Sequence, residues 1–249
     1  MGQRTSAAPK KGKKTLHGYQ SEGLADWAGP LLQGTLTTLE IALAAYAIGI
    51  LLGLMGALAK LGKVRVLAVI ASAYSTIVRA VPELLLIIIL FYAGTQALTA
   101  LMNALGTDGR TEVSGFVAAI AVLAFVQGAY MTEVFRGAIL AIPKGQLEAA
   151  DAYGMTAFMK FRRITVPAML PNALSGMSNL WLILIKDTAL VSVVGFEELF
   201  FTAQQAAAST NKYFTFYAIA GVTYLMLTMA SNAVFSKAEK LARHGQARS

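Results

Sequence analysis

The chain lacks cysteine altogether and is very poor in histidine. Its 249 residues include only His17 and His244, and both stand near the ends of the chain. Without cysteine there is no disulfide and no thiolate metal or redox site. The position of the histidines also argues against a histidine metal centre or general base. We therefore expect no resident metal in this chain.

Charged residues are scarce as well. They make up 14% of the chain, whereas ordinary soluble domains carry about 25%. Hydrophobic residues make up 56% and fall in long runs, a composition typical of a polytopic membrane protein. The formal net charge of +8 is then better explained by basic loops on the cytoplasmic side of a membrane than by nucleic-acid binding.

Several motifs of common enzymes are also missing. No GxxxxGK[ST] phosphate loop is present, and the nearest string, Gly56 to Val64, has the wrong glycine spacing. GxSxG and HExxH motifs are absent too. We therefore expect a non-enzymatic chain that does not hydrolyse ATP. If it drives transport, the energy must come from a partner or an ion gradient.

Five apolar segments are each long enough to cross a bilayer as a helix of about 20 residues. This predicts an all-α membrane protein with about five spans, at residues 31–59, 82–105, 113–134, 168–194 and 213–236. Residues 66–78 are apolar but short, and Pro82 follows them. Because proline lacks an amide donor, we expect a helix break there and an interfacial or re-entrant helix at 66–78.

Basic residues favour one orientation of these spans. The 60–79 and 135–165 connections and the C-terminal tail are rich in lysine and arginine, and five alternating spans place them on one side. The positive-inside rule makes that side cytoplasmic and the N-terminus periplasmic. The lysine-rich residues 1–30 conflict with this, and an extra crossing by 66–78 would remove the conflict. The opposite loops hold four acidic residues, Asp108, Glu112, Glu197 and Glu198, against Arg110 and Lys212.

Two local features leave alternatives open. The polar, basic residues 1–30 carry no apolar core of a cleavable signal peptide and are expected to be a solvated tail, or else to contact anionic lipid. In the first span, Gly49 and Gly53 are four residues apart, a spacing that favours close helix packing. This packing is expected inside the chain, with a dimer seam as the alternative.

The interval from Glu148 to Pro167 is polar and basic, and it separates two spans. Glu148-Ala149-Ala150 is followed after three residues by Gly154, and after nine more by Ile164-Thr165-Val166-Pro167. This interval resembles the EAA loop of type I ABC importer permeases, with Val166 in place of the usual leucine.

Further segments extend the resemblance over roughly residues 30–240. They are similar to the histidine/arginine/octopine subfamily of polar amino acid permeases, at Leu31–Glu40, Val78–Glu83, Ala129–Ala138, Pro143–Glu148 and Lys186–Gly195.

The resemblance implies a type I permease fold and a set of partners. In that family two permease subunits form the path and two ATPase subunits, which hold ATP and magnesium, sit beneath them. A periplasmic binding protein delivers the substrate. A heterodimer of permeases is favoured over a homodimer because that subfamily often pairs two different permeases.

The loop chemistry fits such coupling. A short helix from about Ile142 can project from the membrane, and small residues (Ala149, Ala150) keep it slim. Gly154 can end it because glycine adopts conformations closed to other residues. Glu148 is expected to cap the helix or to pair with a basic partner group. The resemblance assigns the coupling role to Glu148, Ala149, Ala150, Gly154, Arg162, Arg163 and Pro167, while the positive-inside rule alone would also explain the two arginines.

Each charged side chain within an apolar segment needs an ion-pair partner or a water-filled path, since a charge at the centre of the bilayer costs about 2.5–3.5 kcal/mol on insertion scales. We expect Glu83, beside the break at Pro82, and Asp187 to contribute to a cationic amino acid site. The alternatives are ion pairs of Glu83 with Arg79 and of Asp187 with Lys186. Glu133 is expected to pair locally with Arg136, three residues on.

Together these observations predict a permease of an ATP-driven importer of polar, basic amino acids or opines in a bacterial inner membrane. The domain comprises residues 31–236 with a coupling loop at 142–167, and residues 237–249 form a cytoplasmic tail. An ion-coupled secondary transporter is the alternative.

Overall fold

The computed structural model describes residues 25–104 and 115–244, and this part of the chain is built from helices. Four helical segments are long and apolar enough to span a membrane, and the number rises to five when the bent pair α2–α3 is counted as one span. This confirms the predicted all-α architecture with about five spans. The predictions for residues 1–24, for Asp108, Arg110 and Glu112, and for residues 245–249 fall outside the described residues.

The elements follow one another along the chain as α1 (Ala28–Leu61), α2 (Arg65–Ala80), α3 (Glu83–Ala104), α4 (Gly115–Leu140), α5 (Lys144–Ala152), α6 (Ala157–Lys160), the π-helical turn η2 (Phe161–Thr165), α7 (Val166–Asp187), the 3-10 segment η3 (Thr188–Val194), α8 (Leu199–Thr210) and α9 (Tyr213–His244). Helices α4 and α9 continue past the apolar residues that identified them, whereas the predicted span 82–105 corresponds to α3, which qualifies as a span only together with α2.

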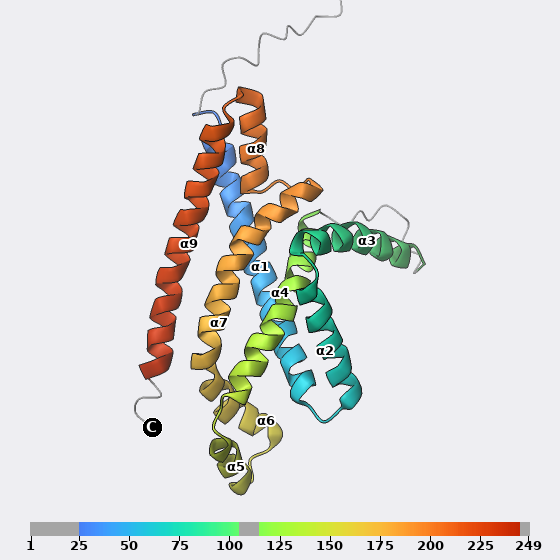
Figure 1. Cartoon of the computed structure of the whole chain (residues 1–249), viewed down its shortest axis with the longest axis vertical. Coiled ribbons are helices and arrows are strands. Elements are labelled where there is room, and N and C mark those ends of the chain that lie inside the picture. The colour runs from blue at the N-terminus through green and yellow to red at the C-terminus, as the bar shows by residue number, and fades with distance from the viewer. Residues whose placement is uncertain (1–24, 105–114, 245–249) are drawn as a thin grey trace, which may run out of the picture.

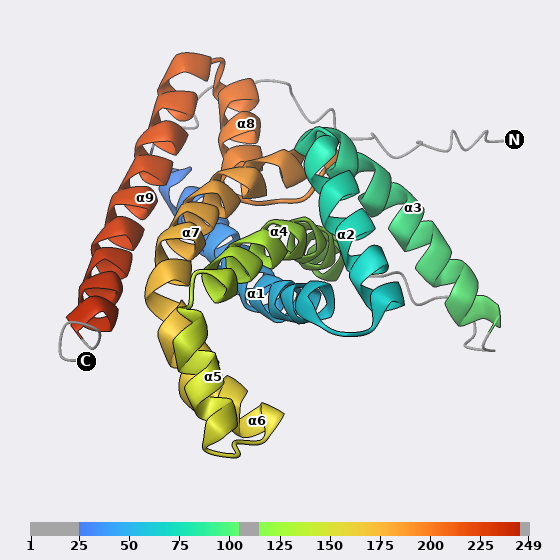
Figure 2. The same ribbon diagram turned by 60° about the horizontal axis from the view of Figure 1, so that its bottom comes forward.

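The long helices α1, α4, α7 and α9 run lengthwise through the molecule, as Figure 1 shows. The short helices α5 and α6 form a knob at one end, and α8 lies at the other end beside the start of α1 (Figure 2). The end of α9 lies at the same end as the knob, whereas α1 begins at the opposite end. The coupling-loop region and the last helix therefore share one side of the structure, as five alternating spans require.

The break predicted at Pro82 is present. Residue Val81 is extended, with φ −95° and ψ 140°, as sterics impose on a residue before proline. Helix α2 ends there, and α3 leaves at 116° to it. The short 66–78 segment is therefore the first arm of a bent pair, and Glu83 begins the second arm.

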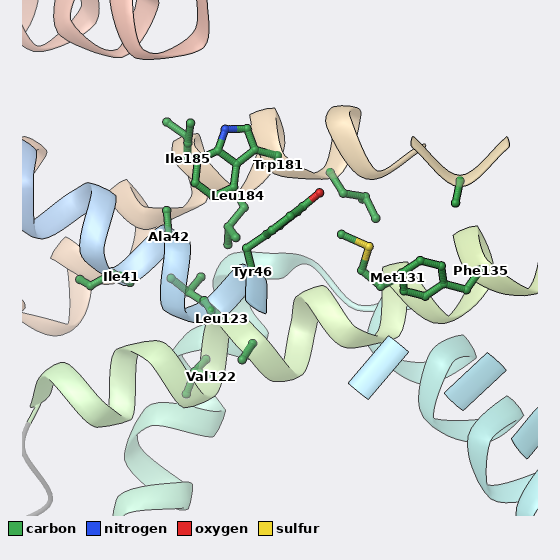
Figure 3. Close-up of a cluster of buried hydrophobic side chains, with 14 of the residues drawn as sticks. Ile41, Ala42, Tyr46, Val122, Leu123, Met131, Phe135, Trp181, Leu184 and Ile185 are labelled. Atoms are coloured by element: carbon green, nitrogen blue, oxygen red, sulfur yellow. The ribbon is translucent and has the colours of Figure 1, made fainter. Parts of the chain in front are cut away.

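Close packing of α1 on α4 organises the core. An added Cβ at Gly49 would lie 3.0 Å from Gln127 Cγ, and one at Gly53 would meet the Met131 side chain and lie 2.8 Å from its backbone carbonyl carbon. The Gly49–Gly53 spacing therefore serves packing within the chain. Figure 3 shows the adjoining cluster, in which Tyr46 stacks edge-on against Trp181 and donates a 2.8 Å hydrogen bond to the Met177 carbonyl.

A second, smaller cluster joins α8 to α1 and α9, and a buried carboxyl lies at its edge. Glu198 is fully buried and caps α8 by accepting a 2.9 Å hydrogen bond from the Phe201 amide. Its other oxygen accepts hydrogen bonds from Thr38 of α1 (3.1 Å) and Tyr224 of α9 (2.8 Å). Burial raises the pKa of the Glu198 carboxyl above its ordinary value of 4.5, and these hydrogen bonds oppose only part of that rise.

We expect Gly53→Val to destabilise the fold by about 1–3 kcal/mol, because overpacking forces backbone shifts where a Cβ meets main-chain atoms. Gly221→Val is the matched control, since an added Cβ at Gly221 meets nothing within 4 Å. Thermal unfolding of the detergent-solubilised protein measures both. Equal unfolding midpoints for the two variants would contradict close packing at the α1–α4 seam.

Glu198 is expected to make stability depend on pH. Because its pKa is raised on folding, the stabilisation is complete below its ordinary pKa of 4.5 and is lost as pH rises through the folded value. Glu198→Gln should reduce the fall of the unfolding midpoint as pH rises above 4.5, and Glu197→Gln, an exposed neighbour, should leave that pH dependence as in wild type. An unchanged slope in Glu198→Gln would refute this role of the carboxyl.

Candidate functional site

The coupling loop forms a compact helical knob. Helix α5 ends at Gly154, whose φ of +68° belongs to the left-handed region that favours glycine. The Gly154 amide donates to the Asp151 carbonyl at 2.9 Å, and the Met155 amide donates to the Ala150 carbonyl at 3.1 Å, which together make a Schellman end. The prediction that glycine ends the first helical piece is confirmed. The chain then turns through α6, which the Thr156 hydroxyl caps by accepting from the Met159 amide.

The predicted coupling residues occupy different faces of this knob. Glu148 and Ala149 are exposed, whereas Ala150 is buried. Only Glu148 and Ala149 can therefore contact a partner subunit. Glu148 lies in the second turn of α5, whose first turn contains no acidic residue. The expectation that Glu148 caps the helix was therefore wrong, because Glu148 is the fifth residue of α5 and lies beyond the first turn, where the unpaired amides are.

The return segment of the loop is basic and leads into the next span. Arg162 and Arg163 are exposed, whereas Lys160 is held by Asp151 in a 2.6 Å ion pair across the knob. Pro167 stands in the first turn of α7, where a missing amide donor costs no helical hydrogen bond. The two arginines therefore remain available to an outside group.

Two large apolar side chains add to this surface. Tyr153 is 84% exposed and Phe158 is 73% exposed, and both belong to the knob formed around α5 and α6. Exposed aromatics on a polar knob are typical anchors of protein interfaces. Neither residue was predicted as a site residue, although both lie inside the loop motif from Glu148 to Pro167.

The break at Pro82 brings two carboxyls together. Glu83 opens α3 and Asp187 closes α7, and their carboxyl groups lie near enough to interact electrostatically. Tyr130 of α4 lies beside Glu83, and the Arg79 guanidinium stands 5.8 Å from the Tyr130 ring centre. Elements that lie far apart in the sequence thus meet at one point inside the apolar region.

The structural ion pairs considered as alternatives for these carboxyls are not formed. Salt bridges join Lys60 and Arg136 to Glu133, and Lys160 to Asp151. Neither Arg79 nor Lys186 reaches Glu83 or Asp187 at salt-bridge distance. Two adjacent carboxyls repel each other when both are ionised, so this arrangement favours a bound cation or a shared proton.

Glu133, by contrast, is neutralised by cations of the same chain. It pairs with Arg136 at 2.9 Å, which confirms the predicted local pair, and also with Lys60 of α1. The Ser75 hydroxyl of α2 donates to the same carboxylate at 3.1 Å. The contacts from Lys60 and Ser75 were missed because neither is a neighbour of Glu133 in sequence. The cluster fastens α1, α2 and α4 together.

A polar cavity of about 770 Å³ lies at the end opposite the knob. Exposed Glu40 and Glu197 line it together with Gln33 and Thr37. Glu40 therefore faces this cavity. In the described part of the chain no group of three or more acidic or histidine side chains is arranged to hold a metal ion.

Comparisons with known proteins agree with the loop motif. A histidine/lysine/arginine/ornithine transport system permease of Salmonella typhimurium is 43% identical over 217 residues, covering 87% of this chain and 95% of its own. A nopaline transport system permease of Agrobacterium fabrum is 42% identical over 224 residues, covering 90% and 95%. An octopine transport system permease of Rhizobium radiobacter is 36% identical over 230 residues, covering 92% and 96%.

A solved structure has the same architecture. An amino acid ABC transporter crystallised with histidines superposes with a TM-score of 0.72 at 30% identity, covering 87% of this chain and 95% of that one. The family described as the inner membrane component of binding-protein-dependent transport systems matches residues 49–240. These matches do not favour the ion-coupled secondary transporter. The chain belongs to this family of inner membrane components, the permeases of ABC transporters for amino acids and opines.

Proposed function

We propose that this permease carries a basic amino acid, or an opine derived from one, through a site that contains Glu83 and Asp187. The observation that carries the proposal is the proximity of these two carboxyls beside the helix break at Pro82. An ammonium or guanidinium group between them would relieve their repulsion and would donate hydrogen bonds to both carboxylates. The relatives named for histidine, lysine, arginine, ornithine, nopaline and octopine support this substrate class.

Neighbouring groups fit the rest of such a substrate. Arg79 is exposed and stands next to the Tyr130 ring, so a positive charge lies at the edge of the acidic pair. An amino acid presents a cation at its side chain and a carboxylate at its backbone. The acidic pair suits the former and Arg79 suits the latter.

The proposed energy source is a pair of ATPase subunits that dock on the α5–α6 knob and hold ATP and magnesium, with no cofactor in this chain. Glu148, Tyr153, Phe158, Arg162 and Arg163 offer charged and apolar groups on one exposed projection. ATP binding would draw the knobs together and turn the path outward, and hydrolysis would reset it.

The remaining assembly follows the same proposal. A second permease subunit, a different chain in preference to a copy, completes the path, and a periplasmic binding protein delivers the substrate. The knob and the C-terminal residues 237–249 face the cytoplasm of a bacterial cell, and the N-terminus faces the periplasm. The permease domain at 31–236 then holds both the acidic pair and the coupling loop at 142–167.

We expect Glu83→Gln and Asp187→Asn each to lower ATP-driven arginine uptake at least tenfold, because a charge-assisted hydrogen bond contributes about 1.5–3 kcal/mol. Proteoliposomes that contain the co-expressed permeases and ATPases, supplied with binding protein, measure uptake. Glu197→Gln removes an exposed carboxylate elsewhere and should behave as wild type. Uptake of arginine and glutamine in wild-type proportion by both site variants would refute the acidic pair as the cation site.

A second experiment tests the docking of the ATPase. Gly154→Val should cut the ATPase that co-purifies with the permease several-fold, because a branched residue strains the left-handed turn by about 1–2 kcal/mol and displaces the knob. Phe158→Ser should do the same by removing an interface anchor. Gly221→Val is the matched control, since Gly221 lies in α9, outside the knob, and has open space around it. Full ATPase retention with intact transport in both Gly154→Val and Phe158→Ser would contradict the docking role of the knob.

A further inference from the structure

An apolar groove lies between the last turns of α1 and the first turns of α2. The two helices are joined by the short turn at residues 62–64, at the same end of the molecule as the knob (Figure 1). The groove has a volume of about 610 Å³ and is lined by apolar side chains that include Met55, Leu58, Leu67 and Ile70. All four are between 41% and 67% exposed, so the chain itself leaves them uncovered.

The turn end of this groove is strongly positive. Lys63 lines the groove and Arg65 opens α2, and both are exposed. No aspartate or glutamate occurs between Ile41 and Pro82, so this segment has no acid of its own to neutralise them. The nearby Lys60 is already engaged by Glu133 and Ser75.

The far end of the groove is closed and held in place. Tyr74 forms part of the lining there, and its hydroxyl donates to the Phe125 carbonyl of α4. The ring also packs on Phe125 at a centroid distance of 4.8 Å. The groove is therefore apolar along its length, and at the end where the spans leave the membrane it has two cations that form no salt bridge with an acidic side chain of residues 25–104 or 115–244.

We propose that this groove binds an anionic phospholipid, with an acyl chain along Met55, Leu67 and Ile70 and the headgroup phosphate at Lys63 and Arg65. An occupant must be apolar along the helices and anionic at the turn, and a phospholipid in the surrounding bilayer meets both conditions. A second copy of this chain fits less well, because it carries a net charge of +8 and would bring the same uncompensated cations. The site is separate from the acidic pair and does not depend on which substrate is carried.

The test compares lipid retention by the complete transporter complex, purified with its co-expressed partners. Complexes are exchanged into nanodiscs of equal phosphatidylglycerol and phosphatidylcholine, and retained lipid is counted by native mass spectrometry. We expect phosphatidylglycerol to be retained in preference to phosphatidylcholine. The double variant Lys63→Gln/Arg65→Gln should lower that preference about ten- to thirty-fold, since each basic residue near an anionic headgroup contributes about fivefold.

Two matched variants make the result specific. Lys237→Gln/Lys240→Gln removes two charges from the last helix and should leave the preference unchanged. Met55→Trp fills the groove while leaving both cations in place, and should lower retention of the lipid. Equal loss in the Lys237/Lys240 variant would mean that net charge alone acts, which would overturn the site.

A photo-crosslinker at residue 55 identifies the occupant directly. Crosslinking to phospholipid supports the proposal. Crosslinking to a permease chain would overturn it in favour of a subunit interface, and equal retention of the two lipids by the wild type would exclude headgroup recognition.

Discussion

The close approach of α1 and α4 is the contact on which the other arrangements depend. Glycine at positions 49 and 53 lets the two backbones meet without intervening side chains. With the seam closed, Lys60 at the end of α1 reaches Glu133 on α4, and Ser75 of α2 joins the same carboxylate. Helix α2 is thereby fixed beside α4, and the break at Pro82 then directs α3 so that Glu83 lies near Tyr130. Small residues in the first span therefore help to position the acidic pair.

The three interior acidic sites differ in how their charge is satisfied. Glu133 has two cations, so its role is structural. Glu198 has hydroxyl and amide donors and no cation, which suits a group that burial biases toward its neutral form. Glu83 and Asp187 have chiefly each other. Only the Glu83–Asp187 pair has negative charge that a bound substrate cation could neutralise. This difference distinguishes the proposed transport site from the two structural sites.

Sequence reasoning succeeded where the physical cause was local. The end of α5 at Gly154, the break at Pro82 and the Glu133–Arg136 pair each follow from residues within one turn of each other. It failed where the cause was tertiary. Glu198 was counted as an acidic residue of an outer loop, yet it is fully buried, because Thr38 and Tyr224 close over it from other helices. Ala150 likewise faces inward, because α5 folds back on its own loop.

The sequence by itself determined that the chain is a helical membrane protein of about five spans with a coupling-loop motif between the third and fourth. Helix formation in a bilayer is compulsory for apolar runs of this length, and a turn at glycine or proline is set by its own backbone limits. Only the tertiary structure decided which charges are neutralised inside the fold and which stay open. Lys60 and Glu133 stand 73 residues apart, and Thr38 and Glu198 stand 160 apart. Such contacts depend on how the helices pack, and no local pattern records them.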